Sequence, residues 1–156
     1  MKNSITETIE NLKDICENDV QILFTVSPVR HTKDGMTENQ LSKSKLICAL
    51  HETLPHFENC HYLPIYEIMM DDLRDYRFYK EDLIHSNQQA IQYIWEKFGN
   101  AYFSEEVKDF ITENYKIKAA LEHRPNDEKS PKYLEFLEKL KEKIALQQQK
   151  VKHKIF

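Results

Sequence analysis

The sequence predicts an α/β domain with few parallel strands, followed by C-terminal helices. Two short apolar runs rich in β-branched or aromatic residues, at 20–26 and 61–66, alternate with segments of helical periodicity. A helical segment separates the two runs, as parallel strands require, because a hairpin can join only antiparallel strands. At 156 residues the chain has the length of one domain. Two strands would leave both outer sheet edges unpaired, so we expect only part of an α/β domain.

The first helix and the first strand follow from the N-terminal sequence. Residues 4–7, SITE, have the pattern of a capping box, in which a serine and a glutamate three residues later cap backbone amides. They predict a helix that ends near Asn18-Asp19. The next run, VQILFTV, predicts a strand buried on both faces. We expect it to end at Ser27-Pro28, because proline cannot donate to the strand ladder.

The middle of the chain predicts a crossover helix and a second strand. A polar loop at 30–35 precedes a second capping box, TENQ, which predicts a helix over 37–54. The second strand is expected at 61–66 and a short helix at 67–76. Residues 77–85 show no periodicity and are expected to form an irregular connection.

The last third of the sequence is helical. A third capping box, SNQQ at 86–89, predicts a helix that stops at Gly99, with a core-facing stripe of Ala90, Ile91, Ile94, Trp95 and Phe98. Ser104 predicts the start of another helix, whose inner face is Val107, Phe110 and Ile111. After a polar break at 124–127, a final amphipathic helix is expected from about Pro131. We therefore divide the chain into an α/β part, 1–124, and a C-terminal helix, 125–156.

Composition excludes several classes of function. The net charge of −4 gives no basic field for nucleic acid or an anionic membrane. Three cysteines without a CxxC pattern, and no apolar run of about 18 residues, lead us to expect a cytoplasmic protein with reduced thiols. Two glycines in the whole chain exclude a glycine-rich phosphate loop. The spacing of His51, His56, Cys60 and His61 is irregular for zinc, so we expect no metal and no cofactor.

The most informative local pattern is an acid–histidine pair. Asp82 lies three residues before His85, which stands directly ahead of a predicted helix start. A histidine acts as a general base when an anionic partner holds its tautomer and stabilises the imidazolium. If the backbone between them turns, Asp82 can reach the inner ring nitrogen of His85. A structural loop that ends in a helix cap has the same spacing, so the pattern alone leaves both interpretations open.

Three stretches of the sequence resemble the GSCFA family. They are TVSPVRHTKDGMTENQLSKSKL (25–46), YLPIYEIMMDDLRDYRFYKEDLIH (62–85) and NQQAIQYIWEKF (87–98), and the resemblance covers roughly residues 10–100. It implies a three-layer α/β/α fold around a parallel sheet, SGNH- or flavodoxin-like, and ester hydrolysis through a serine acyl-enzyme. By position, it implies that Asp82 orients the imidazole and that His85 is the general base.

The nucleophile that this resemblance requires is missing from the sequence. In the family the serine belongs to a Gly-Ser-Cys-Phe stretch upstream, and none of Cys16, Cys48 and Cys60 follows a Gly-Ser pair. We therefore expect an incomplete hydrolase that is inactive alone, with an upstream half-domain or self-association completing it. The substrate would be an ester, such as a small molecule or an acetylated saccharide. The alternative is a non-catalytic module that associates through its sheet edges and its C-terminal helix.

The loop after the first strand supplies candidate substrate-binding residues. Ser27 ends that strand, where α/β proteins place ligand-binding groups, and Arg30 and His31 follow it. Ser27 lacks the glycine-flanked elbow of a nucleophile, so this role for it ranks last. We expect Arg30 to hold an anionic or carbonyl group of the substrate, and a loop brace or a surface ion pair is an equal alternative.

Overall fold

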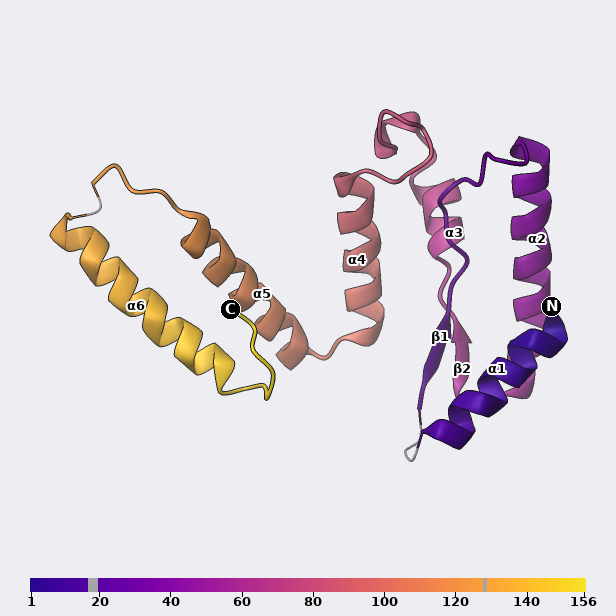
Figure 1. The fold of residues 1–156 in the computed structure, drawn as a ribbon, viewed down its shortest axis with the longest axis horizontal. Helices are drawn as coiled ribbons and strands as arrows, with labels where there is room; N and C mark the ends of the chain where they lie inside the picture. Colours follow the sequence, from indigo (N-terminus) through magenta and orange to yellow (C-terminus); the bar gives the residue numbers. More distant parts are fainter. Residues whose placement is uncertain (17–19, 128) are drawn as a thin grey trace. The chain divides into compact units, whose positions relative to one another are not determined.

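A computed structural model describes residues 1–16, 20–127 and 129–156 of the chain (Figure 1). The chain forms two compact units, Met1–Lys97 and Phe98–Phe156. The elements are α1 (Lys2–Ile15), β1 (Ile22–Phe24), α2 (Met36–Thr53), a 3₁₀ turn (Leu54–His56), β2 (Cys60–Tyr62), α3 (Ile65–Glu67), a π-helical turn (Ile68–Asp72), a second 3₁₀ turn (Tyr76–Phe78), α4 (Gln88–Tyr102), α5 (Glu105–Glu122) and α6 (Pro131–Gln148).

The first unit contains a two-stranded parallel sheet, as predicted. β1 pairs with β2 in parallel, and Leu23 lies opposite His61. The backbone amide of Ile22 donates to the Asn59 carbonyl at 2.8 Å, and the Leu63 amide donates to Phe24 at the other end, also at 2.8 Å. Helix α2 makes the crossover between the strands. The mixed α/β class with few parallel strands is therefore confirmed.

Both strands are shorter than the sequence predicts. β1 and β2 span three residues each, and the residues of β1 are only partly buried. The expectation of a strand buried on both faces is therefore wrong. Within the described residues, β1 pairs with β2 alone. The ladder of backbone hydrogen bonds along β1 therefore ends where β2 ends.

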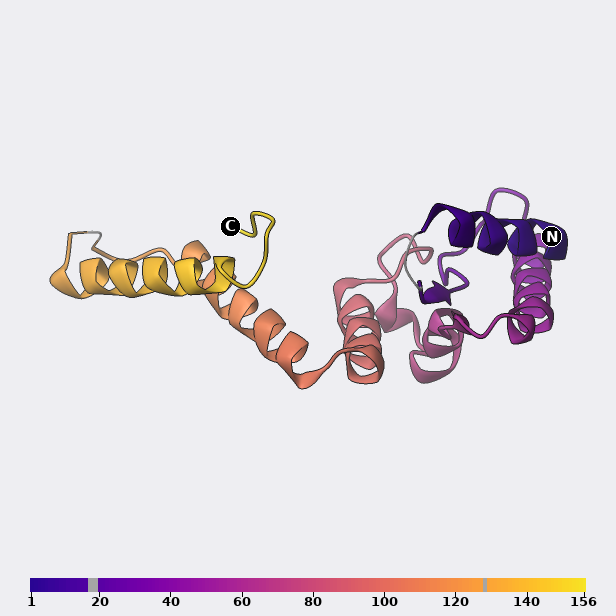
Figure 2. The same ribbon diagram turned by 90° about the horizontal axis from the view of Figure 1, so that it is seen from below.

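One face of the sheet packs on α1 and α2. The shared core is buried and apolar, with Ile9 from α1 and Leu50 from α2 at its centre. Alternate residues of β1, Ile22 and Phe24, point into this core, as the two-residue period of a strand requires. Figure 2 shows α1 beside α2 within this unit. The two helices therefore cover the same face of the sheet, since both pack into one cluster.

The first two capping boxes do not cap their helices. α1 begins at Lys2, so Ser4 lies inside it, where its carbonyl accepts a hydrogen bond from the Thr8 hydroxyl at 2.7 Å. The predicted end near Asn18-Asp19 lies outside the described residues. α2 begins at Met36, because Gly35, at φ 103° and ψ 165°, turns the chain in a conformation that only glycine adopts easily. The helix therefore starts before the predicted box.

Helix α4 differs from its prediction at both ends. Its cap is Asn87, whose side-chain oxygen accepts from the Ala90 amide at 3.1 Å, while the Ser86 hydroxyl contacts the Met69 sulfur at 3.6 Å. The helix runs through Gly99 to Tyr102, so the predicted stop at Gly99 is wrong. Of the predicted stripe, Ala90 is fully buried and Ile94 packs beside it, but Ile91 and Trp95 are exposed.

The second unit contains a hairpin of antiparallel helices, α5 and α6 (Figure 1). Both helix starts were predicted. Ser104 accepts a hydrogen bond from the Val107 amide at 3.4 Å, and Ser130, directly before Pro131, accepts from Tyr133 at 3.3 Å. Val107, predicted to face inward, is 40% exposed, so the prediction for this residue is wrong. In the described part of the chain, no helix is long and apolar enough to cross a membrane.

Candidate functional site

The candidate site is a closed turn between the second 3₁₀ turn, Tyr76–Phe78, and α4. The Lys80 amide donates to the His85 carbonyl at 2.8 Å, and the Leu83 amide donates to the Lys80 carbonyl at 2.9 Å. One residue further out, Tyr79 and Ser86 form an antiparallel bridge. Leu83 has a φ of 56°, in the left-handed region that branched residues rarely occupy. The turn that joins Asp82 to His85 therefore has a strained but closed backbone.

Within this turn Asp82 and His85 form a hydrogen-bonded pair. The His85 Nδ1 lies 2.7 Å from Asp82 Oδ2. The other carboxylate oxygen, Oδ1, accepts from the backbone amides of Ile84 at 2.8 Å and His85 at 3.0 Å. Three donors thus fix the Asp82 carboxylate. Among the residues that the structure describes, Nε2 of His85 has no hydrogen-bond partner, so this nitrogen is free to exchange a proton.

These hydrogen bonds hold Asp82 in its ionised form. The backbone amide of His85, its imidazole and then the amide of Ile84 lower the pKa of the Asp82 carboxyl well below its ordinary range. The His85 side chain is 54% exposed and that of Asp82 is 41% exposed. The carboxylate of the pair is therefore charged, and the imidazole is open to solvent.

The pKa of Asp82 predicts a pH dependence of stability. A carboxyl whose pKa is lower in the folded protein stabilises the fold above its unfolded pKa of about 3.9, and loses this contribution as the pH falls through the folded value. We expect the difference in free energy of unfolding between the wild type and Asp82→Asn to be constant above about pH 5 and to shrink below about pH 4. Urea titrations of both proteins from pH 7 to pH 2.5 measure this difference. A difference that stays constant over the whole range would show that the folded protein does not stabilise the Asp82 carboxylate.

Arg30 ties the turn to the loop that follows β1. Its Nη1 donates to the Leu83 carbonyl at 2.8 Å, and its backbone amide donates to the Ile84 carbonyl at 3.3 Å. The guanidinium lies over the Tyr79 ring, 4.2 Å from its centroid, and 5.5 Å from that of Tyr76. The loop brace that the sequence left open for Arg30 is therefore present. This brace anchors the carbonyl of Leu83, the residue of the turn whose backbone is strained.

Ser27 and His31 lie on the same loop but make other contacts. The Ser27 hydroxyl accepts from the Val29 amide at 3.2 Å, and its carbonyl accepts from Lys43 at 2.6 Å. His31 Nε2 lies 3.0 Å from Asp34 Oδ2, so this ring has its own carboxylate. In the described ranges, no hydrogen bond joins Ser27 or His31 to the Asp82–His85 pair. The fold thus brings together Arg30, Asp82 and His85, and leaves the other two candidates at the edge of this group.

A small pocket adjoins the turn. It has a volume of about 170 Å³ and is lined by Arg30, Met69, Met70, Leu73, Arg74, Asp75, Tyr76 and Tyr79. Its walls contact the turn at two points, because Arg30 binds Leu83 and Met69 contacts Ser86. We call it the Arg30 pocket.

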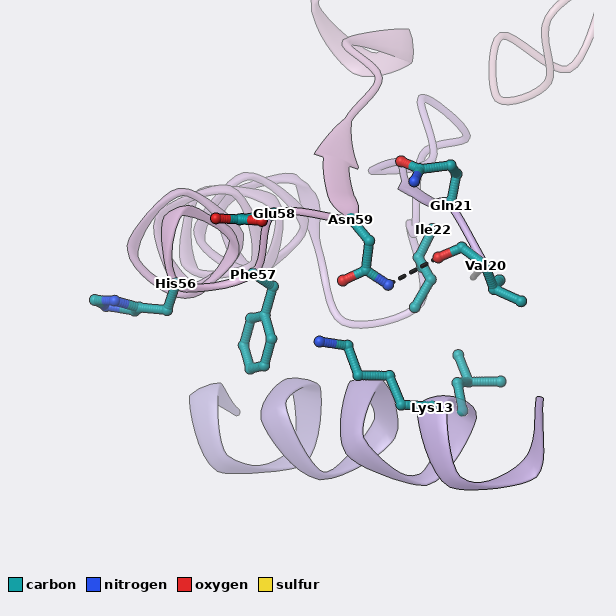
Figure 3. Close-up of a pocket in the computed structure, with 9 residues that line it drawn as sticks. Lys13, Val20, Gln21, Ile22, His56, Phe57, Glu58 and Asn59 are labelled. Atoms are coloured by element: carbon teal, nitrogen blue, oxygen red, sulfur yellow. Dashed lines mark hydrogen bonds between the residues drawn. The ribbon is translucent and has the colours of Figure 1, made fainter. Parts of the chain in front are cut away.

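A larger pocket lies at the opposite ends of the strands (Figure 3). Its volume is about 740 Å³, and it lies between α1 and the residues that precede β1 and β2. Asn59 donates to the Val20 carbonyl at 2.7 Å across it, and the Lys13 ammonium lies 5.1 Å from the Phe57 ring centroid. Parallel α/β sheets bind ligands at the carboxyl ends of their strands, and this pocket is at the amino ends. The turn, together with the loop after β1, is therefore the better candidate site.

Two of the histidines considered for a metal, His51 and His61, each contact a different neighbouring side chain. The His51 ring packs edge-on against Tyr62 at 4.9 Å, and His61 Nε2 lies 3.0 Å from the Gln21 side-chain oxygen. Among the residues that the structure places, no group of three or more histidine, cysteine, aspartate or glutamate side chains is arranged to hold a metal ion.

Sequence reasoning missed two residues that shape the site. The left-handed Leu83 carries no sequence signal, because leucine is not a residue that favours positive φ. Tyr79 is not among the candidate residues of the sequence analysis, yet it is buried, pairs with Ser86 and lies under the Arg30 guanidinium. The concentration of aromatic residues at 76–79 was the available signal for it.

Comparison with known families covers most of the chain. The model described as "GSCFA family" matches residues 1–98, and the one described as "GSCFA domain protein, C-terminal domain" matches residues 115–155. No curated protein and no solved structure matches the chain.

Proposed function

Because this chain belongs to the GSCFA family, we propose that it carries the acid and the base of a serine ester hydrolase whose nucleophile lies outside these 156 residues. The observation that supports the proposal best is the 2.7 Å contact between Asp82 and the inner nitrogen of His85. With Nδ1 held by the carboxylate, Nε2 is the nitrogen that faces a reacting hydroxyl in a Ser-His-Asp triad.

Each residue then has a definite role in the reaction. His85 takes the proton of the attacking serine through Nε2 and later returns a proton to the leaving alcohol. Asp82 fixes the tautomer of His85 and stabilises the imidazolium, and its lowered pKa keeps it ionised while it does so. Arg30 lies on the substrate side in this proposal, with the loop residues Ser27 and His31 at its edge. Backbone amides near the serine would hold the oxyanion.

The open edge of β1 offers a place for the segment that carries the nucleophile. α1 and α2 cover the same face of the sheet. Connections between parallel strands are right-handed in nearly all proteins, so two crossovers on one face continue the sheet in one direction. A strand joined to β1 through α1 would therefore lie beside β1, on the edge away from β2. Its carboxyl end would then be at the same side of the sheet as Ser27 and Arg30.

A second function is supported by the same open edges. A two-stranded sheet exposes backbone donors and acceptors that another strand can use, and the helical hairpin exposes Leu121, Leu134 and Leu146. A non-catalytic module could use these surfaces to associate with itself or with a partner. A chain that forms a defined dimer and gains no activity with an upstream segment would favour this second function.

The test is reconstitution of the complete site. We expect the 156-residue chain alone to hydrolyse p-nitrophenyl acetate no faster than buffer. The same chain, produced with the protein segment encoded immediately upstream of it, fused or as a second chain, should hydrolyse the ester and react with a fluorophosphonate at a serine. Hydrolysis by the isolated chain that disappears in His85→Ala would contradict the proposal, since the nucleophile would then lie within the chain. A reconstituted protein without esterase activity and without serine labelling would contradict it too.

A further inference from the structure

The Arg30 pocket combines an apolar wall with a cation. Met69 and Leu73 are 1% and 3% exposed, and Tyr79 is buried beside them. These side chains belong to a compact apolar cluster that also contains Ala90 at the start of α4. The pocket therefore has a rigid floor, and a ligand seated in it would exchange water for hydrocarbon contacts on one side.

Arg30 is the cation in this pocket that has no acidic partner. Among the described residues, no carboxylate lies within salt-bridge distance of its guanidinium, whereas Arg74 is 3.0 Å from Asp71 and Arg77 is 3.9 Å from Asp75. Asp75 lines the pocket, but its Oδ1 accepts from the Arg77 amide at 2.8 Å. Its other oxygen, Oδ2, lies 3.9 Å from Arg77 Nε, so Arg77 is the cation paired with it.

The guanidinium of Arg30 is also held in place with donors to spare. Of its five N–H donors, one is used within the part of the chain that the structure describes, from Nη1 to the Leu83 carbonyl. The guanidinium also lies over the Tyr79 ring, and this contact and the bond to Leu83 restrain the side chain, so less of its freedom is lost when a ligand binds. A planar guanidinium without an acidic partner suits a carboxylate, because two parallel N–H donors fit the two carboxylate oxygens, and the apolar wall beside it favours an anion that carries a hydrocarbon chain.

We propose that the Arg30 pocket binds a compact carboxylate, with the two oxygens on Arg30 and a short hydrocarbon chain against Met69 and Leu73. A volume of about 170 Å³ has room for roughly six water-sized groups, which corresponds to an acid of about the size of butyrate. The inference rests on the proposed function for the origin of the ligand, since ester hydrolysis releases a carboxylic acid beside His85. It deepens that function by assigning the substrate class: esters of short, unbranched acids.

The test is a titration of the wild-type chain with sodium butyrate at constant ionic strength, followed by the methyl resonances of Met69, Met70 and Leu73. We expect saturable shifts at these methyl groups, and none with 1-butanol, which has the hydrocarbon chain without the charge. Arg30→Gln should weaken butyrate binding about tenfold or more, the effect of removing a charged hydrogen-bond donor. Arg124→Gln is the control, because Arg124 is an exposed arginine after α5 that does not line the pocket.

A second variant separates pocket filling from any loosening of the turn. Met70 is half-buried and lines the pocket, and no described hydrogen bond joins it to Arg30. Because phenylalanine would fill the space for the hydrocarbon chain, Met70→Phe should reduce butyrate binding and leave acetate binding unchanged. Three results would each overturn the inference: no saturable shift, equal affinity in Arg30→Gln, or tighter binding of inorganic phosphate than of butyrate. Binding needs no nucleophile. Butyrate binding without hydrolysis in the reconstituted protein would therefore reject the proposed function and leave the carboxylate site in place.

Discussion

In the reconstituted hydrolase, His85→Ala is expected to lower kcat by roughly 10⁴-fold or more, because the serine then has no base to take its proton. Asp82→Asn should cost about 10⁴-fold as well. The amide can still accept the backbone N–H bonds at Oδ1, but it cannot stabilise the imidazolium through the 2.7 Å contact to Nδ1. Because the two residues act as a unit, the double variant should be scarcely worse than His85→Ala alone.

Steady-state hydrolysis of p-nitrophenyl acetate measures these effects, with far-UV circular dichroism to confirm folding. His56→Ala is the control, since His56 is an exposed residue of the 3₁₀ turn after α2. It should keep full activity. A His85→Ala protein that retains more than about a tenth of the wild-type kcat would exclude His85 as the general base, because general-base catalysis contributes at least about a hundredfold.

The largest effect on stability is expected at Ile9, the fully buried residue of α1. It lies in the core with Leu50 and Val26, so Ile9→Ala removes three carbon atoms from a closely packed site. We expect a loss of about 2–5 kcal/mol in free energy of unfolding, the usual range for such a truncation. A loss of this size is a large fraction of the stability of a typical domain.

A matched control lies on the same helix. Ile15 is 76% exposed at the last position of α1, and Ile15→Ala should change the free energy of unfolding by about 0.5 kcal/mol or less. Urea denaturation followed by circular dichroism gives both values. Equal effects for the two variants would mean that α1 does not pack on the sheet as described.

The fold class could be predicted from the sequence because the spacing of apolar residues differs between the two strands and the crossover helix. The exact helix starts were harder to predict. Gly35 and Asn87 begin α2 and α4, although a serine or threonine box stood near each of them. A capping box is a local pattern, whereas the residue at which a helix begins also depends on the path of the preceding loop. Ser104, as predicted, caps α5, and Ser130 caps α6; among the described residues, neither hydroxyl has a hydrogen-bond partner far away in the sequence.

The candidate site was predictable only in its local part. The Asp82–His85 contact spans three residues, so spacing alone suggested it. The bond from Arg30 to Leu83 joins residues 53 apart in the chain, and no local pattern indicates such a partner. The sequence left Arg30 as either a substrate ligand or a brace. The structure shows the brace, and the role in binding remains our proposal.

The same separation in sequence has a consequence for how the protein folds. Hydrogen bonds within residues 80–85 close a small ring of the chain, and loops of this length close in about 10–100 ns. The bond from Arg30 has to wait until β1 and β2 have paired and a much longer stretch has been closed at an entropic cost. The acid–base pair can thus form transiently in the unfolded chain, while its fixed orientation is acquired late. Mutations that slow the pairing of β1 with β2 should therefore delay the ordering of Arg30 on Tyr79 without delaying the turn itself.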